Sequence, residues 1–174
     1  PGEGTCFTIF LPVIEDKPVD VMPATLKVPG GTERIMFVDD EPFQTDLGRQ
    51  MLERLGYHVS VFTKSIDALK AFAAAPAAFD LVITDMTMPG MTGDQMASQM
   101  MRQRPQLPVI ICTGFSKRLP EAQKSSTGIR AFLMKPVTVQ ELSRTVRDVL
   151  DHSGGRPAKN ENSPSSPASP KPGQ

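Results

Sequence analysis

Five short apolar runs alternate along the chain with longer segments in which apolar residues recur every three or four positions. The runs lie at residues 35–38, 58–62, 81–85, 109–112 and 131–134. Short runs rich in β-branched and aliphatic residues, bounded by turn residues, are typical of strands in a parallel sheet. The longer segments have the period of amphipathic helices. The pattern therefore predicts five β/α units.

Each predicted helix carries one apolar stripe, which we expect to face the sheet. The second helix is predicted to begin with Ser65 as its N-cap. The last begins with a capping box formed by Thr138 and Glu141. A weaker helix is expected from Leu119 to about Ser126. The stripes consist of Phe43, Leu47, Met51 and Leu55, of Ile66, Leu69 and Phe72, of Met96, Ala97, Met100 and Met101, and of Leu142, Val146, Val149 and Leu150.

Alternating strands and helices predict a doubly wound parallel sheet with right-handed crossovers and helices on both faces. Residues 58–62 alternate between apolar and polar side chains, as an edge strand does, which favours the strand order 2-1-3-4-5. In such a sheet, ligands bind beyond the carboxyl ends of the strands, where the strand order reverses. We therefore expect the chemistry of the protein between the first and third strands.

The segments outside this α/β region differ in composition. Residues 1–12 contain one strand-like alternating stretch, and residues 13–31 have the Pro, Gly and mixed charges of a linker. The α/β domain is predicted to span residues 32–151. Residues 152–174 are dominated by Gly, Pro, Ser, Asn and Lys, so we expect a disordered tail that cannot contribute to a core. Both terminal segments are expected to be flexible.

Composition narrows the class of protein. The 174 residues are 39% hydrophobic, with a formal net charge of zero, which suits one ordinary core. No stripe of Lys and Arg favours nucleic acid or an anionic membrane, and no apolar stretch approaches the roughly 20 residues that span a bilayer. Cys6 and Cys112 lie far apart, and Cys112 is expected to be a buried free thiol. This usage fits a cytoplasmic protein.

Carboxylates follow the first and third predicted strands. Asp39 and Asp40 come after the first strand and Asp85 ends the third, so the predicted strand order brings all three together. Three carboxylates repel one another unless one is protonated or a cation lies among them. Mg²⁺ prefers oxygen ligands and keeps several waters, which suits an open site of this kind. The sequence therefore favours a magnesium site.

Thr113 and Lys135 follow the fourth and fifth predicted strands, on the opposite flank of the same site. A hydroxyl and an ammonium group opposite a metal ion suit a phosphoryl group, because its transfer depends on positioning and on neutralising its oxygens. Asp85 would then be the nucleophile that forms an acyl phosphate. Ordinary structural roles also fit: helix caps or turns for the aspartates, a strand-end cap for Thr113 and an ion pair for Lys135.

Taken together, these motifs resemble the receiver domain of two-component response regulators, over about residues 32–151. The resemblance implies a flavodoxin-like fold like that of the chemotaxis regulators. It rests on Asp39-Asp40, on Asp85 followed by Met88-Pro89-Gly90 and Gly93, on Thr113-Gly114 and on Lys135-Pro136.

The resemblance also implies a role for each site residue. Asp85 would accept phosphate from a histidine, and a Mg²⁺ ion would lie beside it. The implied direct ligands are Asp40, Asp85 and the backbone carbonyl of Thr87, with Asp39 acting through water. Thr113 and Lys135 would bind the phosphoryl group, and Thr113 and Phe132 would form a conformational switch.

The first twelve residues, PGEGTCFTIFLP, resemble the last glycine-rich box and final strand of a histidine-kinase ATP-binding domain. With the receiver-like region, they imply the C-terminal part of a hybrid sensor histidine kinase whose catalytic core is not in this chain. The implied partners are a histidine kinase or histidine phosphotransfer domain as phosphodonor, and a possible downstream phosphotransfer protein. The chain would catalyse only its own phosphorylation and slow hydrolysis.

Two other functions are compatible with the residues. A flavodoxin-like interaction domain that is not phosphorylated would use the acidic cluster structurally, and the cluster would not respond to Mg²⁺. A phosphatase with an aspartate nucleophile would carry an acid/base aspartate close after it, but Thr87 stands at that offset. The residues thus favour a phosphoacceptor over either alternative.

Overall fold

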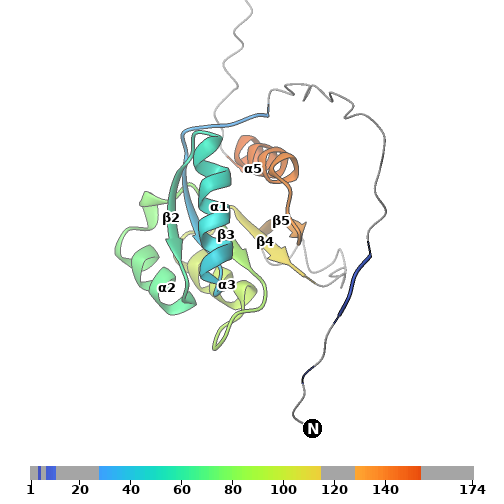
Figure 1. Cartoon of the computed structure of the whole chain (residues 1–174). Helices are drawn as coiled ribbons and strands as arrows, with labels where there is room; N and C mark the ends of the chain where they lie inside the picture. The colour runs from blue at the N-terminus through green and yellow to red at the C-terminus, as the bar shows by residue number, and fades with distance from the viewer. Residues whose placement is uncertain (1–3, 5–6, 11–27, 115–127, 154–174) are drawn as a thin grey trace, which may run out of the picture.

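The computed structural model describes residues 4, 7–10, 28–114 and 128–153. The helix expected from Leu119 to Ser126 and the tail from residue 154 onward lie outside these residues. The described part contains five strands and four α-helices, shown in Figure 1. In chain order they are β1 (Arg34–Val38), α1 (Pro42–Arg54), β2 (His58–Phe62), α2 (Ser65–Ala74), β3 (Leu81–Asp85), α3 (Gly93–Gln103), β4 (Val109–Thr113), β5 (Ile129–Met134) and α5 (Val139–Ser153).

The five strands form one parallel sheet in the order β2-β1-β3-β4-β5. This confirms the predicted fold class and strand order. β3, in the middle of the sheet, is buried along its whole length, whereas β2 at the edge is only partly buried. The alternating pattern of residues 58–62 therefore identified the edge strand correctly.

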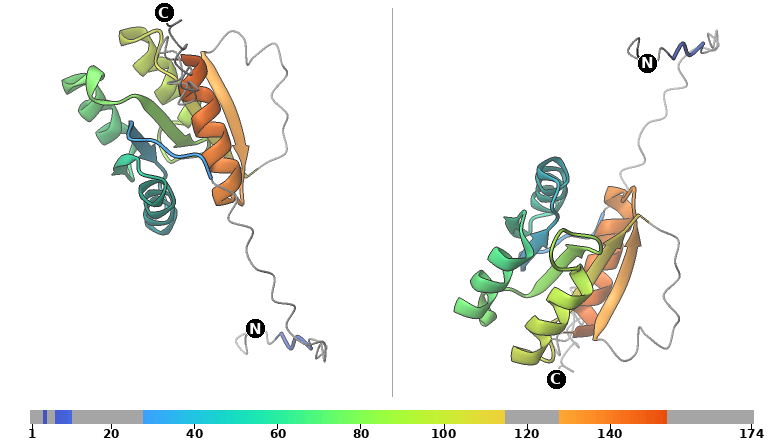
Figure 2. Two further views of the ribbon diagram at one scale, coloured as in Figure 1. Left: turned by 90° about the horizontal axis from the view of Figure 1, so that it is seen from above. Right: turned by 90° about the horizontal axis from the view of Figure 1, so that it is seen from below.

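Helices cover both faces of the sheet, and Figure 2 shows the sheet lying between them. Alternate residues of β1 divide the core: Ile35 and Phe37 pack toward α1 and α5, and Met36 and Val38 pack toward α2 and α3. The two predicted stripes on α3 and α5 point into these cores, with Met96 and Val146 fully buried. The Thr138–Glu141 capping box is present as predicted.

The stripes predicted for α1 and α2 are partly wrong. Phe43 is 74% exposed and Ile66 is 56% exposed. The side of α1 that faces the sheet carries Thr45, Gly48 and Leu52 instead. The cause is close packing, because a side chain on Gly48 would approach the Phe37 ring to 2.5 Å. The small residue Gly48 thus lets α1 lie close to the sheet. Phe43, at the N-terminal end of the same helix, faces outward.

The chain enters the domain along α5. Ser143 donates a hydrogen bond from its hydroxyl to the backbone carbonyl of Pro29, and the Gly31 N–H donates to the carbonyl of Leu55 at 3.1 Å. Farther upstream, residues 7–10 form no strand (Figure 1). Their apolar side chains are 79–89% exposed. The strand expected there is absent from these four residues, because no neighbouring strand pairs with them.

Candidate functional site

The predicted site residues gather at the carboxyl edge of the sheet because the strands run parallel and end together. Asp85 is the last residue of β3, and Thr113 is the last residue of β4. Asp39 directly follows β1, which pairs with β3 up to Val38 and Thr84. Lys135 directly follows β5, and its N–H donates to the Thr113 carbonyl at 2.9 Å. Four strands thus deliver one chemical group each.

Lys135 joins two of the carboxylates. Its ammonium nitrogen lies 2.7 Å from Asp39 Oδ2 and 2.6 Å from Asp85 Oδ1. Asp39 is 2% exposed and Asp85 is 7% exposed. Burial acts to lower the pKa of Lys135, but its hydrogen bonds to Asp39 and Asp85 outweigh this effect and raise the pKa above its ordinary value. The lysine is therefore a fixed positive charge between two buried acids.

Backbone N–H groups orient the two buried carboxylates. Thr87 donates its N–H to Asp85 Oδ2 at 2.6 Å, and Glu41 donates its N–H to Asp39 Oδ1 at 3.0 Å. Each carboxylate therefore has one oxygen held by its own loop and the other turned to Lys135. The Asp85 loop is fixed to the next strand as well, through the Met86 N–H and the Cys112 carbonyl at 2.8 Å.

Other predicted site residues lie around this centre. Asp40 is partly exposed and lines a neighbouring cavity of about 490 Å³. Thr87 is exposed, Thr113 is partly exposed, and Phe132 packs partly buried against the core on the α2/α3 side. Within the described residues, no group of three or more His, Cys, Asp or Glu side chains is gathered as metal ligands. The expected carboxylate trio is therefore not assembled, since Lys135 lies between two of its members.

The chemistry of these groups nevertheless fits a divalent cation. Asp39, Asp40, Asp85 and Lys135 carry three negative charges against one positive charge, which leaves a formal charge of −2. The available donors are carboxylate and carbonyl oxygens, the ligands that Mg²⁺ prefers. Asp40 follows Asp39 in the chain and is partly exposed, so a partly hydrated ion could reach it.

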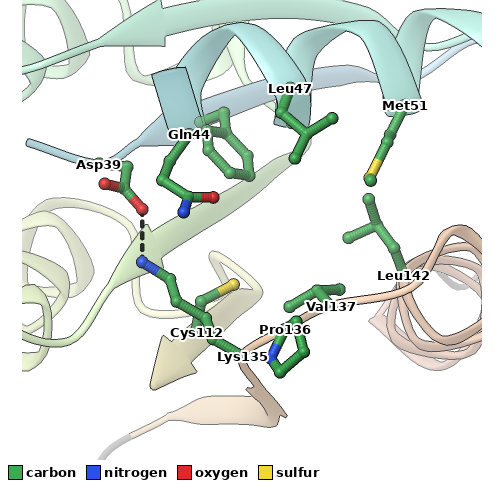
Figure 3. A pocket seen from close by; sticks show the side chains of 11 residues that line it. Asp39, Gln44, Leu47, Met51, Cys112, Lys135, Pro136, Val137 and Leu142 are labelled. Carbon is green, nitrogen blue, oxygen red and sulfur yellow. Dashed lines mark hydrogen bonds and ion pairs between the residues drawn. The ribbon is translucent and has the colours of Figure 1, made fainter. Parts of the chain in front are cut away.

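An apolar cavity of about 160 Å³ adjoins Lys135, and its lining is shown in Figure 3. Leu47 and Met51 contribute from α1, and Val137 contributes from the loop before α5. Cys112 also lines it, and burial raises the pKa of this free thiol to about 12. The cavity could not be predicted from the sequence, because the apolar stripe of α1 predicts a face buried in the core, whereas Leu47 and Met51 of that stripe line the cavity.

The fold and these strand-end groups define a phosphoacceptor domain of the receiver class. In agreement, the family model of the response regulator receiver domain matches residues 35–147. The chain belongs to this family. It is a receiver domain of the kind found in two-component response regulators, as its motifs implied.

Two relatives are sensor kinases. The chain is 29% identical to the sensor kinase CckA of Brucella abortus over 164 residues, which cover 86% of this chain and 17% of the kinase. It is 31% identical to the sensor protein EvgS of Escherichia coli K12 over 145 residues, 82% of this chain and 12% of that protein. The chain thus spans less than a fifth of the length of these kinases.

Solved structures agree with the fold. A response regulator receiver domain from Clostridium thermocellum superposes with a TM-score of 0.65 at 29% identity and covers 69% of this chain and 95% of that chain. The response regulator TrrA of Thermotoga maritima, in complex with Mg²⁺ and BeF, has a TM-score of 0.61 at 29% identity and covers 68% and 99%. In the described part of this chain, no helix is long and apolar enough to cross a membrane.

Proposed function

We propose that Asp85 accepts a phosphoryl group from a phosphohistidine in a Mg²⁺-dependent reaction. The observation that carries this proposal is the pairing of Asp85 Oδ1 with the Lys135 ammonium at 2.6 Å, at the end of a buried central strand. An Asp85 carboxylate oxygen attacks phosphorus, the P–N bond breaks, and its electron pair returns to the imidazole nitrogen. Lys135 and Thr113 then neutralise and hold the phosphoryl oxygens.

A phosphodonor of low molecular weight tests this proposal. Incubation with phosphoramidate and Mg²⁺, followed by intact mass measurement, is expected to show the gain of one phosphoryl group. An interaction domain with a purely structural acidic cluster would gain none. The same incubation without Mg²⁺ is expected to give a much slower gain, because the centre keeps its uncompensated negative charge.

The proposed metal site uses Asp40, Asp85 and the Thr87 carbonyl as direct ligands, with Asp39 acting through water. The division between the two neighbouring aspartates is supported by their surroundings: Asp39 is buried against Lys135, whereas Asp40 is partly exposed and has room for a hydrated ion. When bound, Mg²⁺ offsets negative charge on the carboxylates and the phosphoryl oxygens.

Replacing Asp40 by alanine is therefore expected to weaken Mg²⁺ binding more than replacing Asp39, by a further factor of about ten. Calorimetric Mg²⁺ titrations of the two variants measure the difference. Glu41→Ala is the matched control. Glu41 is an exposed acid that directly follows Asp40, and replacing it removes the same negative charge. Equal affinities of the Asp39 and Asp40 variants would contradict the division between direct and water-mediated ligands.

The proposal includes a conformational switch. Thr113 stands at the end of β4, and Phe132 lies on the adjacent strand β5, where it pairs with Ile111, two residues before Thr113. A phosphoryl group on Asp85 would draw the Thr113 hydroxyl inward, and the Phe132 ring would occupy the space that it leaves. The change would alter the surface around β5 and α5, where a downstream partner could read it.

We place the phosphodonor on the outward face of α1. Phe43 is 74% exposed and Leu47 is 37% exposed; Leu47 also lines the apolar cavity beside Lys135. A helix of a histidine kinase or phosphotransfer domain could cover this apolar surface while its phosphohistidine reaches Asp85.

The parent protein is part of the same proposal. The match to the Brucella kinase runs over 164 residues, which is longer than the receiver match at residues 35–147. This supports residues 1–12 as a kinase remnant, 13–31 as linker, 32–151 as receiver and 152–174 as tail of a hybrid sensor kinase.

Cys112 is a free thiol, which supports a cytoplasmic location of the receiver domain.

Serine in place of Phe43 and Leu47 is expected to slow phosphoryl transfer from a phosphorylated histidine phosphotransfer domain at least about tenfold, because apolar anchors near an interface centre carry much of the binding energy. The rate with phosphoramidate is expected to stay unchanged, since that donor needs no docking surface. Ile66→Ser is the control, an exposed apolar residue on α2. Equal slowing with both donors would place the defect in the chemistry and contradict a docking role.

A further inference from the structure

Ser65 makes an unexpected long-range contact. It is the first residue of α2 and is only 5% exposed. The N-cap of α2 is Lys64, so the N-cap role predicted for Ser65 is wrong by one residue. The Ser65 hydroxyl donates to the backbone carbonyl of Met91 at 3.0 Å and lies 3.8 Å from Met88 Sδ. Both methionines belong to the loop that follows Asp85, so a buried hydroxyl on α2 reaches the loop of the proposed phosphoacceptor.

The loop in question comprises residues 86–92. Its near end carries Thr87, whose N–H holds Asp85 Oδ2. Its far end returns to its own start, where the N–H of Gly93, the first residue of α3, donates to the Met86 carbonyl at 2.9 Å. Between these ends Gly90 has a φ of +79°, a conformation that residues with a side chain rarely adopt. The hydrogen bond from Ser65 ties Met91, in the outer half of this loop, to α2.

The surroundings leave only the tip of the loop room to move. The cavity of about 490 Å³ lies between the start of α2 and this loop, and its lining includes Asp40, Ser65, Pro89 and Gly90. Met88 is buried in the core and Met91 packs against it, so packing holds these two residues, whereas Pro89 and Gly90 at the tip of the loop are exposed. The hydrogen bond from Ser65 to Met91 joins α2 to the loop at one edge of this cavity, and Asp40 also lines the cavity.

We infer that Ser65 is a positioning residue for phosphoryl transfer. Its hydrogen bond to Met91 holds the loop in the arrangement that places the Thr87 N–H on Asp85 and the Thr87 carbonyl at the metal side. Ser65 touches neither the reacting atoms nor the metal; it acts through the loop backbone. This inference rests on the proposed function of Asp85, which it deepens by adding a residue from α2 to the site.

Ser65→Ala tests the inference. We expect a loss of about fivefold in Mg²⁺ affinity and in the rate of mass gain from phosphoramidate, the size of one net hydrogen bond. Hydrogen exchange of the Thr87 amide is expected to accelerate by a similar factor, while the amides of Ile35–Val38 keep their rates. Ser65→Thr retains the hydroxyl and is expected to restore all three quantities to within about twofold of the original.

Ser143→Ala is the matched control. Ser143 is also a buried helix serine whose hydroxyl donates to a distant backbone carbonyl, that of Pro29, but it lies on α5, far along the chain from the loop. Both alanine variants are expected to lose similar stability in urea. Only Ser65→Ala is expected to change Mg²⁺ affinity, phosphorylation and Thr87 exchange.

Two results would overturn the inference. One is a Ser65→Ala variant with the original Mg²⁺ affinity and Thr87 exchange rate; the other is Ser143→Ala losing as much Mg²⁺ affinity as Ser65→Ala. Failure of the proposed function looks different, because the unchanged protein would then gain no phosphoryl group. In that case Thr87 exchange still decides whether Ser65 positions the loop.

Discussion

Replacing Asp85 by asparagine is expected to abolish the gain of a phosphoryl group from phosphoramidate. Asparagine has almost the same shape, so β3 and its loop keep their packing, and its carbonyl oxygen can still accept a hydrogen bond from Lys135 or the Thr87 N–H. The neutral amide is a far weaker nucleophile than a carboxylate, and no acyl phosphate can form. Intact mass spectrometry after equal incubation of both proteins measures the loss.

Asp80→Asn is the control for this experiment. Asp80 directly precedes β3, at the amino-terminal end of the strand and away from the site, where it forms an ion pair with Arg34 at 2.9 Å. This variant removes the same carboxylate charge close to the same strand and is expected to gain one phosphoryl group at the original rate. If Asp85→Asn gained one phosphoryl group as fast as the unchanged protein, another residue would be the acceptor.

The arrangement of the sheet and the position of the site could be predicted because both follow from local pattern. Short apolar runs alternating with helical periods leave few topologies, and right-handed crossovers with an edge strand at residues 58–62 leave one preferred order. Once the order is fixed, residues that directly follow strands must meet. Asp39, Asp85 and Lys135 meet for that reason alone.

The side of α1 that faces the sheet could not be predicted from its stripe. Periodicity shows that Phe43 and Leu47 share a helix face, but it does not distinguish a face that packs on the sheet from one that faces a partner. Gly48 and Thr45 decide the question, because only small side chains allow α1 to approach Phe37. Small residues such as Thr45 and Gly48 contribute little to a hydropathy pattern. The pattern of α1 therefore follows its larger apolar residues, which lie on a different face.

The contacts of individual side chains could not be predicted from the sequence either. Ser65 is predicted as the N-cap of α2, but Lys64 occupies that position, and the Ser65 hydroxyl donates to the carbonyl of Met91, 26 residues away. The sequence allows Lys135 either a phosphoryl group or an ion pair, but it does not show that the ammonium bridges both Asp39 and Asp85. Such contacts depend on the exact approach of loops from different strands, which neither spacing nor residue type specifies.

Lys135→Met is expected to separate metal binding from phosphoryl transfer. The substitution keeps most of the side-chain volume but removes the ammonium between Asp39 and Asp85. Two nearly buried carboxylates then face each other without a counter-charge, so the free energy of unfolding should fall by about 3 kcal/mol in the absence of metal. Mg²⁺ would supply the missing positive charge. We therefore expect Mg²⁺ affinity to hold or rise, and Mg²⁺ to recover most of the lost stability.

Phosphorylation of the same variant is expected to slow at least about a hundredfold even in saturating Mg²⁺, because the phosphoryl oxygens lose their fixed cation. Urea unfolding with and without Mg²⁺, together with mass gain from phosphoramidate, measures both effects. Lys64→Met is the control, an exposed lysine beside the cavity that Asp40 also lines. A parallel loss of Mg²⁺ affinity and phosphorylation in Lys135→Met would show that Lys135 supports the metal site instead of the phosphoryl group.

The pH dependence of this comparison has a definite sign. The pKa of Lys135 is raised in the folded protein, so its ion pairs contribute fully below the ordinary lysine value of roughly 10.4 and are lost only as pH rises through the higher folded value. The stability difference between Lys135→Met and the unchanged protein should therefore be constant between about pH 7 and pH 9, and should shrink at strongly alkaline pH. A difference that vanished near neutral pH would mean that Lys135 is not the charge that holds Asp39 and Asp85 together.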